Sequence, residues 1–466
     1  PRPGIAVAAP AAGGAQRAAH RLQAMGYSDV AVLEGGTREW AEAGYTLFAG
    51  VNVPSKLFGE LIEHEYHTPR ITVHELVRMQ AAKEDFVIVD GRPYAEYHKM
   101  NIPGGVCCPN AELPYRIGAM VNNPNTKIIV NCAGRTRSIM GAQTLINFGV
   151  PNPVYALENG TQGWVLADLE LERDASRRYP DHVDATRLPA LQTQAKSLMT
   201  RHDVSLVSSH DVNEWQRDSQ RTTYLLDVRT PEEFQAGSLP GAVHAPGGQL
   251  IQATDQWVGV RNARIVLLDS EGVRAPVVAS WLKQLGCNVY VLAEGIRADV
   301  RARPAPTPAL PRLSGINATQ LKHALDANAC TAFDLGPSMR FRETHIPGSR
   351  WSIRSRLAHD ARNAENTIVL IADEPGIAQI AAVDLIEAGL RDVKLLEGGL
   401  AAWRAAGLPT EASAAVPPDS ECIDYLFFVH DRHAGNREAM KQYLAWETGL
   451  IAQLDGEDRK LFRVGV

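Results

Sequence analysis

Short apolar runs recur along the chain and alternate with longer segments whose apolar residues have helical spacing. One such run, Ile128-Ile-Val-Asn131, is followed by a helix-like segment from Ile139 to Phe148. Alternating strands and helices of this length predict an α/β fold, with a parallel sheet covered by helices on both faces. In such sheets, reactive loops lie at the carboxyl ends of the strands.

This strand-and-helix pattern is repeated, which predicts an array of one module. Four segments share an ending, in which a helix-terminating glycine precedes a short strand and a glycine-containing turn. Three segments share a beginning, in which a strand ends in aspartate and an Ile-Pro-Gly or Leu-Pro-Gly turn follows. The endings start at Gly26, Gly149, Gly286 and Gly389, and the beginnings contain Asp90, Asp227 and Asp334.

The repeat divides the chain into five parts. Residues 1–50 match only the second half of a module, so we expect its missing strands to lie upstream or this piece to pack against a neighbouring module. Complete modules are expected at residues 70–172, 202–300 and 314–411, and a separate helical tail at 416–466. Capping boxes at Thr72–Glu75 and Asn317–Gln320 predict the first helix of two modules.

The tail does not follow the repeat. Residues 437–454 predict one amphipathic helix that docks onto the modules or onto a second subunit, which would make a homo-oligomer. Just before it, His430-Asp431-Arg432-His433 suggests either a metal or catalytic cluster or a solvated loop. We favour the solvated loop, because two histidines without further ligands do not form a metal site.

Composition narrows the possible partners and location. The net charge of -6 gives no electrostatic reason to expect binding to nucleic acid or to an anionic membrane, and no apolar run reaches the roughly 18 residues that span a bilayer. The spacing of the cysteines supports neither a disulfide scaffold nor a metal site, so we expect no cofactor and a reduced, cytoplasmic setting. The six cysteines are Cys107, Cys108, Cys132, Cys287, Cys330 and Cys422.

Cys132 carries the candidate chemistry. It stands between a strand and a helix, in the loop Cys132-Ala-Gly-Arg135-Thr-Arg137-Ser138. Backbone N–H groups, the positive end of the helix and the two arginines would all favour thiolate over thiol. The alternative is a small buried hydrophobic residue at a strand end, but two arginines so close in sequence fit that interpretation poorly.

Four motifs together resemble the rhodanese, or sulfurtransferase, family. They are the Asp-x-Arg box at Asp90 and Arg92, the Ile-Pro-Gly turn, the strand-cysteine-loop-helix arrangement and the Leu-Glu-Gly-Gly-x-x-x-Trp ending. The resemblance covers nearly everything except the tail and the linkers. It implies tandem rhodanese-like modules, each with a central parallel sheet, and a cysteine that carries sulfur as a persulfide.

Aligned on the shared glycines, only the second module has a thiol at the position implied by the family. The corresponding residues are Ala9, Asp269 and Ala372, so the other three modules are expected to be catalytically silent. A carboxylate at position 269 would be repelled or protonated, so we expect that loop to have closed or changed. Arg274, at the position of Arg137, is expected to form an internal ion pair.

The resemblance implies a reaction in which Cys132 takes the outer sulfur of a small anionic donor such as thiosulfate and passes it to cyanide or a thiol. Backbone N–H groups would hold the persulfide, Arg135 and Arg137 would bind the donor's oxyanion end, and Ser138 would cap the following helix. Asp90 and Arg92 would brace the loop. The predicted substrate-binding set is Ala133, Gly134, Arg135, Thr136, Arg137 and Ser138.

Two alternatives remain open at this stage. In cysteine phosphatases, a related loop places its phosphate-binding arginine one residue further along, where this chain has Ser138. The chain could also be a binding array in which Cys132 is a sulfur acceptor or redox sensor. Cys107 and Cys108 could then resolve a persulfide, although burial within the module is the simpler expectation.

Overall fold

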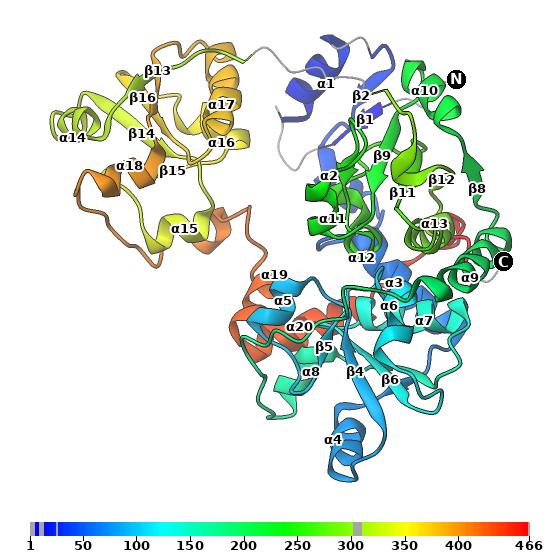
Figure 1. The fold of residues 1–466 in the computed structure, drawn as a ribbon. Helices are drawn as coiled ribbons and strands as arrows, with labels where there is room; N and C mark the ends of the chain where they lie inside the picture. Colours follow the sequence, from blue (N-terminus) through cyan, green and yellow to red (C-terminus); the bar gives the residue numbers. More distant parts are fainter. Residues whose placement is uncertain (1–4, 9–13, 25–26, 302–309, 465–466) are drawn as a thin grey trace. The chain divides into compact units, whose positions relative to one another are not determined.

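Three five-stranded sheets form the framework of the protein, in a computed structural model that describes residues 5–8, 14–24, 27–301 and 310–464. In each sheet the strands follow one spatial order, in which the module's first strand lies beside its fifth, then the fourth, second and third. Neighbouring strands are parallel throughout, and helices flank the sheets (Figure 1). The predicted α/β fold of tandem modules is confirmed.

The second module shows how the sequence specifies these elements. Thr72 and Glu75 form the predicted capping box at the start of α4. Gly149 ends α7 with φ of 84°, a conformation that glycine adopts without strain. The elements are α3 (Val53–Tyr66), β3 (Arg70–Ile71), α4 (Val73–Ala81), β4 (Phe86–Asp90), α5 (Tyr94–Lys99), β5 (Val106–Cys107), α6 (Leu113–Met120), β6 (Lys127–Asn131), α7 (Thr136–Phe148), β7 (Val154–Leu157) and α8 (Gly160–Leu166).

The third module follows a connecting helix, α9 (Leu188–Arg201), that begins directly after the turn η1 (Ala185–Arg187). Ser208 and Asp211 form a capping box at its first helix. Its elements are β8 (Ser205–Val207), α10 (Ser209–Arg217), β9 (Thr223–Asp227), α11 (Pro231–Ala236), β10 (Val243–His244), α12 (Gly247–Gln252), η2 (Thr254–Gln256), β11 (Arg264–Leu268), α13 (Arg274–Gln284), β12 (Asn288–Leu292) and η3 (Gly295–Arg297).

The fourth module repeats the same layout. Asn317 and Gln320 form the predicted capping box. Its elements are β13 (Ser314–Ile316), α14 (Ala318–Asp326), β14 (Cys330–Asp334), α15 (Ser338–Glu343), β15 (Arg350–Trp351), α16 (Arg354–Asp360), β16 (Thr367–Ile371), α17 (Pro375–Glu387), β17 (Val393–Leu396) and α18 (Gly399–Ala405).

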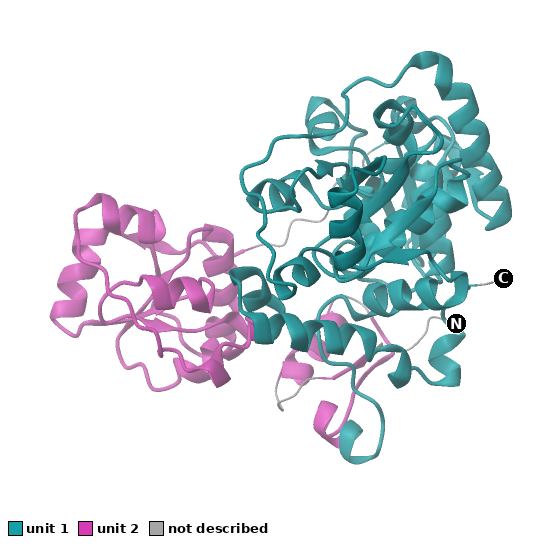
Figure 2. Cartoon of the chain, turned by 90° about the horizontal axis from the view of Figure 1, so that it is seen from below, with its two compact units in different colours: residues 1–3, 40–304, 428–466 teal, residues 4–39, 305–427 magenta. Residues whose placement is uncertain are grey.

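The chain divides into two compact units, shown in Figure 2: unit 1 contains residues 1–3, 40–304 and 428–466, and unit 2 contains residues 4–39 and 305–427. Both terminal parts expected from the sequence are therefore split between units. Residues 40–50 fall in unit 1, with the second and third modules, and residues 416–427 fall in unit 2, with the fourth module.

The half module consists of a two-stranded parallel sheet and two helices, and its residues as far as Glu39 lie in unit 2 with the fourth module. Arg21 forms ion pairs with Asp384 and, at 2.9 Å, with Glu387 of α17. Packing against another module, one of the two expected arrangements, is thus the observed one. The elements are β1 (Ile5–Val7), α1 (Gly14–Ala24), β2 (Val30–Val32) and α2 (Gly36–Glu42).

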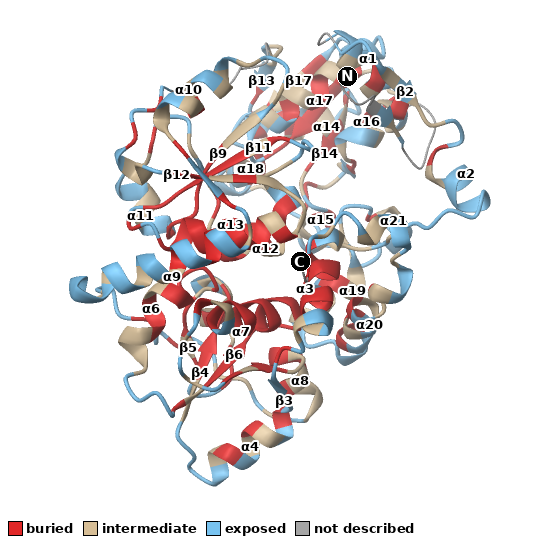
Figure 3. Ribbon diagram, turned by 90° about the vertical axis from the view of Figure 1, so that its right-hand side faces the viewer, coloured by how far each residue is buried: buried red, intermediate tan, exposed pale blue. Residues whose placement is uncertain are grey.

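The second and third modules share one hydrophobic core within unit 1. Phe58 and Met140 of the second module pack in the same cluster as Trp281 and Leu282 of the third. Trp281 also donates a hydrogen bond from Nε1 to Thr144 Oγ1 at 2.8 Å. Helices α7 and α13 are accordingly buried along most of their lengths (Figure 3). The two modules therefore form one compact unit with a continuous hydrophobic core.

From Phe428 onward, the tail docks onto the second and third modules, one of its two expected positions. The predicted helix of residues 437–454 ends earlier than expected, at Thr448, because the chain turns at Gly449 and places Leu450 against Leu57 and Leu61. The tail elements are η4 (Asp419–Glu421), α19 (Phe427–His430), η5 (Asp431–Ala434), α20 (Arg437–Thr448), η6 (Ile451–Gln453) and α21 (Gly456–Arg459).

The start of α8 supports the loop between β6 and α7. Thr161 N donates to Cys132 O at 2.8 Å and Gln162 N donates to Ala133 O at 3.1 Å. Gly160 lies so close to this loop that a Cβ there would stand 2.2 Å from Cys132 O. A glycine is therefore required for the loop to rest on α8.

Replacing Gly160 with alanine is expected to destabilise the protein by at least about 2 kcal/mol more than replacing Gly104. Both glycines have positive φ, +52° and +81°, so both alanines carry similar backbone strain. Only Gly160→Ala also meets a backbone atom, because nothing lies within 4 Å of a Cβ at Gly104. Urea unfolding measures the difference, and equal losses for the two variants would contradict this account of the loop.

Candidate active site

Cys132 lies at the carboxyl end of the central strand β6, where the sequence places it. Its side chain is buried, with 2% of the residue exposed. The sulfur lies 3.2 Å from Ser138 Oγ. Ser138 is the third residue of α7 and also donates to Arg135 O, so the expectation that it caps the helix is wrong: Arg135 occupies the N-cap position. The cysteine is thus buried, but beside a polar group.

Asp90 and Arg92 brace the neighbouring strand end. Arg92 donates from Nε and Nη2 to the two carboxylate oxygens of Asp90, at 2.9 and 2.7 Å, and Nη2 also reaches Met100 O at 2.6 Å. Asn131, directly before the cysteine, donates to Asp90 Oδ2 at 3.1 Å. This network ties β4 to β6 below the loop, as a bracing role requires.

Arg135 is paired with carboxylates of α3. Its Nε and Nη2 contact the two oxygens of Glu60, each at 2.8 Å, and Nη2 also contacts Glu63. Burial raises the pKa of Glu60 to about 7, although Arg135 opposes the shift. The guanidinium group therefore joins α3 to the loop and differs from the open donor-binding group that the sequence suggested.

Arg137 is also paired in two directions. Nη1 and Nη2 contact the carboxylate of Glu96 at 2.7 and 2.8 Å, and Nη1 contacts Gln249 Oε1, from the third module, at 3.0 Å. Burial would raise the pKa of Glu96, but the charge and hydrogen bonds of Arg137 outweigh it and lower that pKa to about 2. Arg137 is therefore held in place by a charged and a neutral acceptor.

A carboxylate from the tail covers the other side of the loop. Thr136 Oγ1 donates to Glu447 Oε1 at 2.5 Å, and Lys56 Nζ donates to Thr136 Oγ1 at 3.2 Å and lies 3.5 Å from Glu447 Oε1. Glu447 is completely buried. Burial disfavours the charge of Lys56, but Tyr443 and Glu447 outweigh burial and raise the pKa of the lysine.

The sequence analysis missed both Lys56 and Glu447. Lys56 lies in the segment that precedes the second module, and Glu447 is separated from Thr136 by 311 positions along the chain. The only local signal is a glutamate placed among apolar and aromatic residues of the tail, and such a glutamate is normally solvent-exposed. The partner of a buried charge is not visible in a single sequence.

Of the two histidines before α20, His430 is exposed, as a solvated loop predicts, and His433 is partly buried. Arg432 stacks over the ring of Tyr443, with Cζ 3.3 Å from the ring centroid, and donates to His433 Nε2 at 3.1 Å. Burial, with Arg432 close by, lowers the pKa of His433 to about 4. Within the described residues, no cluster of three or more His, Cys, Asp or Glu side chains could hold a metal ion.

The third module fills its own loop with a carboxylate. Asp269, in the position of Cys132, accepts hydrogen bonds from the backbone N–H groups of Gly272, Val273 and Ala275 at 2.8 to 2.9 Å. The expectation of repulsion is wrong, because the loop holds the carboxylate. Burial and the neighbouring Glu271 raise the pKa of Asp269 to about 7, so the expected tendency toward protonation is present.

The expected internal ion pair of Arg274 is confirmed. Its guanidinium group contacts Glu271 and Glu233 of the third module and Glu112 of the second. In the fourth module, Ala372 holds the corresponding loop position, since its carbonyl oxygen is the atom nearest a Cβ placed at Gly399. Ala9 of the half module lies outside the described residues.

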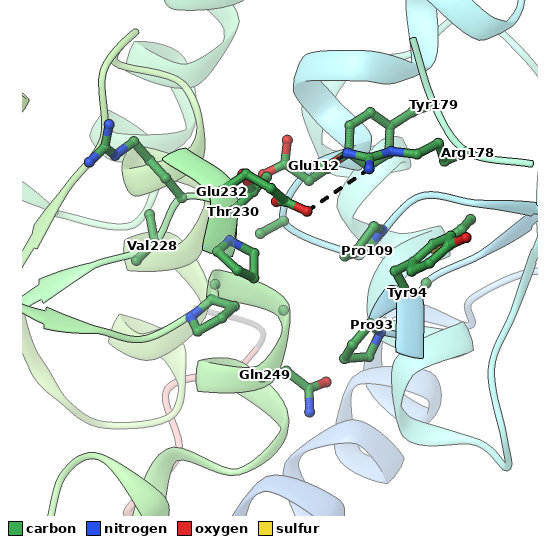
Figure 4. A pocket seen from close by; sticks show the side chains of 18 residues that line it. Pro93, Tyr94, Pro109, Glu112, Arg178, Tyr179, Val228, Thr230, Glu232 and Gln249 are labelled. Atoms are coloured by element: carbon green, nitrogen blue, oxygen red, sulfur yellow. Dashed lines mark hydrogen bonds and ion pairs between the residues drawn. The ribbon is translucent and has the colours of Figure 1, made fainter. Parts of the chain in front are cut away.

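Cys107 and Cys108 are buried within the module, as expected from the sequence, with 1% and 0% exposed. Burial, reinforced by Asp90, raises the pKa of the Cys107 thiol to about 12. Cys107 lines a cavity of about 120 Å³ between the second and third modules. Figure 4 shows this cavity, with Arg178 and Glu232 3.9 Å apart across it; Cys132 is not among its lining residues.

None of the described helices is both long and apolar enough to cross a membrane.

Comparisons with known proteins agree with this geometry. The family model described as "Rhodanese-like domain" matches residues 72–167, 208–302 and 317–406. The crystal structure of thiosulfate sulfurtransferase from Pseudomonas aeruginosa is 42% identical, with a TM-score of 0.87, over 98% of this chain and 88% of that chain.

Two curated proteins match shorter parts of the chain. Thiosulfate sulfurtransferase GlpE from Pseudoalteromonas translucida is 30% identical over 93 residues, which are 20% of this chain and 89% of that protein. The HTH-type transcriptional regulator Rv0324 from Mycobacterium tuberculosis is 27% identical over 202 residues, which are 42% of this chain and 87% of that protein.

Replacing Glu447 with glutamine is expected to lower the free energy of unfolding by about 3 kcal/mol, because the buried ammonium group of Lys56 loses its countercharge. Glu438→Gln is the matched control on the same helix. Its side chain is 82% exposed, so its loss should stay within about 0.5 kcal/mol. Equal unfolding midpoints for the two variants in urea would show that Glu447 does not pair with Lys56.

Proposed function

The chain belongs to the rhodanese-like family, and from that premise we propose that its second module transfers sulfane sulfur through a persulfide on Cys132. Family membership and the similarity to a thiosulfate sulfurtransferase support sulfurtransferase activity in general. The observation that carries the proposal is the loop itself, in which a thiol follows the central strand, beside Ser138 and the fixed charge of Arg137. The corresponding positions hold carboxylate in the third module and alanine in the fourth.

The proposed reaction has two steps. The Cys132 thiolate attacks the outer sulfur of a small anionic donor such as thiosulfate, the donor's S–S bond breaks, and sulfite leaves with the bonding electrons. An acceptor, cyanide or a thiolate, then attacks the outer sulfur of the persulfide and restores the Cys132 thiolate. This is covalent catalysis with ping-pong kinetics.

The different partners of Arg135 and Arg137 indicate a different role for each. Arg135 is committed to two carboxylates of α3, which suits a structural role. Arg137 interacts electrostatically with Cys132 as well as with Glu96, so it would balance the negative charge of thiolate and persulfide. We propose that Arg137 stabilises the sulfur anion.

For a donor to reach the Cys132 sulfur, some of the residues that bury it must move. Only 2% of Cys132 is exposed, and the tail contacts the loop through Thr136 and Glu447. A donor would therefore enter when the loop and the α20 segment separate. Closure afterwards would protect the persulfide from water and from other thiols.

Replacing Cys132 with serine is expected to abolish sulfur transfer from thiosulfate to cyanide. Cys287→Ser is the matched control, because Cys287 lies in the third module, after the end of α13 and outside the proposed site. Intact mass after thiosulfate treatment should show a gain of one sulfur in the native protein and in the control, lost again on addition of cyanide.

Transfer that persists in the serine variant would refute the assignment of Cys132. A gain of sulfur that cyanide fails to remove would instead favour the interpretation of Cys132 as a sulfur acceptor without turnover. Hydrolysis of an aryl phosphate by the native protein, lost in the serine variant, would favour a phosphatase.

A further inference from the structure

In the second and third modules alike, the loop arginine contacts a side chain of its own module and one of the other module. Arg137 of the second module contacts its own Glu96 and also Gln249 of the third. Arg274 of the third module contacts its own Glu233 and also Glu112 of the second. Each third-module residue occupies the position of its second-module counterpart in the repeat, so Gln249 corresponds to Glu112.

The groups that surround the two arginines differ in charge. Arg274 is completely buried among three carboxylates, those of Glu233, Glu271 and Glu112. Arg137 has one carboxylate and one amide, because Gln249 stands in place of Glu112 and Gly134 stands in place of Glu271. Arg274 is thus surrounded by an excess of negative charge, whereas Arg137 and Glu96 balance one to one.

We propose that Gln249 of the third module acts on Cys132 through Arg137, because it gives the arginine a neutral acceptor and so adds no second negative charge beside the sulfur. A carboxylate at this position would also accept from the arginine, but together with Glu96 it would leave a net negative charge there. The inference rests on the proposed function of Cys132 and gives the silent module a part in that function.

Gln249 is rigidly placed for this role. It lies on α12, whose Leu250 is completely buried, and the helix packs directly on the second module. A Cβ at Gly247 would lie 2.7 Å from Ala111 Cβ, and one at Gly248 would lie 3.2 Å from the backbone nitrogen of Asn110. Figure 4 shows Gln249 on the third-module side of the cavity between the modules. The amide therefore reaches Arg137 from a fixed helix.

Other charged groups also face this site, and all of them remain unchanged when only position 249 is varied. They come from the ends of β4 and β6, from α3, α5 and α7, and from the tail. These groups are Asp90 and Arg92, Glu96, Lys56, Arg135 with Glu60 and Glu63, Arg432 and His433, and Tyr443 with Glu447. A shift seen on varying Gln249 alone reports the added charge.

The test is the pH titration of the Cys132 thiolate, followed by its ultraviolet absorbance as the difference between each protein and its Cys132→Ser counterpart. Gln249→Glu keeps the shape and the acceptor oxygen and adds one negative charge. We expect the titration midpoint to move to higher pH by about one unit, because a second anion near the sulfur disfavours the thiolate. This measurement requires no sulfur transfer, so it stands apart from the test of the proposed function.

Two controls separate charge from packing. Gln249→Leu removes the acceptor without adding charge, and Gln256→Glu adds the same charge at an exposed position of the same module. Both should keep the midpoint within a few tenths of a unit of the native value. Equal shifts for Gln249→Glu and Gln249→Leu, or no shift for Gln249→Glu in a protein with native unfolding behaviour, would overturn the proposal.

Discussion

In the proposed reaction a sulfur anion on Cys132 is shielded from water, and such an anion must be matched by a fixed positive charge. The charge of Arg137 is itself costly to bury, so Glu96 holds it by two hydrogen bonds. A second carboxylate would leave the group with a net negative charge. The neutral amide of Gln249 avoids this, because it accepts from a guanidinium N–H without adding negative charge.

The third module shows the opposite solution to the same problem. There the loop carries its own acid, Asp269, held by three backbone N–H groups, and Arg274 is surrounded by carboxylates. Arg274 therefore lies in an excess of negative charge, which disfavours the binding of an external anion. This charge distribution, together with the missing thiol, supports the expectation that the third module is catalytically silent. That module still contributes a hydrophobic core shared with the second module and the surface that carries Gln249.

The fold was largely predictable from sequence, because strand runs, helix-ending glycines and capping boxes are local signals that recur in each module. Position within the repeat also identified Cys132, Asp269 and Ala372 as equivalent. The contacts of Arg135 and Arg137 were not predictable. Their partners Glu60, Glu96 and Gln249 come from separate elements that only the fold brings together. The early end of the tail helix is similar: Leu450 leaves the helical path because a pocket formed by Leu57 and Leu61 buries it.

Around the Cys132 loop, the tail forms a close hydrogen bond, but two buried side-chain oxygens lack a partner among the described residues. Glu447 Oε1 is bound by Thr136, but Glu447 Oε2 and Gln162 Oε1 are buried without a hydrogen-bond partner among the described residues. Both side chains border Gly134, where an ideal Cβ would lie 3.4 Å from Glu447 Oε2 and 3.1 Å from Gln162 Nε2. In the proposed opening, water would reach both oxygens, and their hydration would offset part of the free energy lost when the tail separates from the loop.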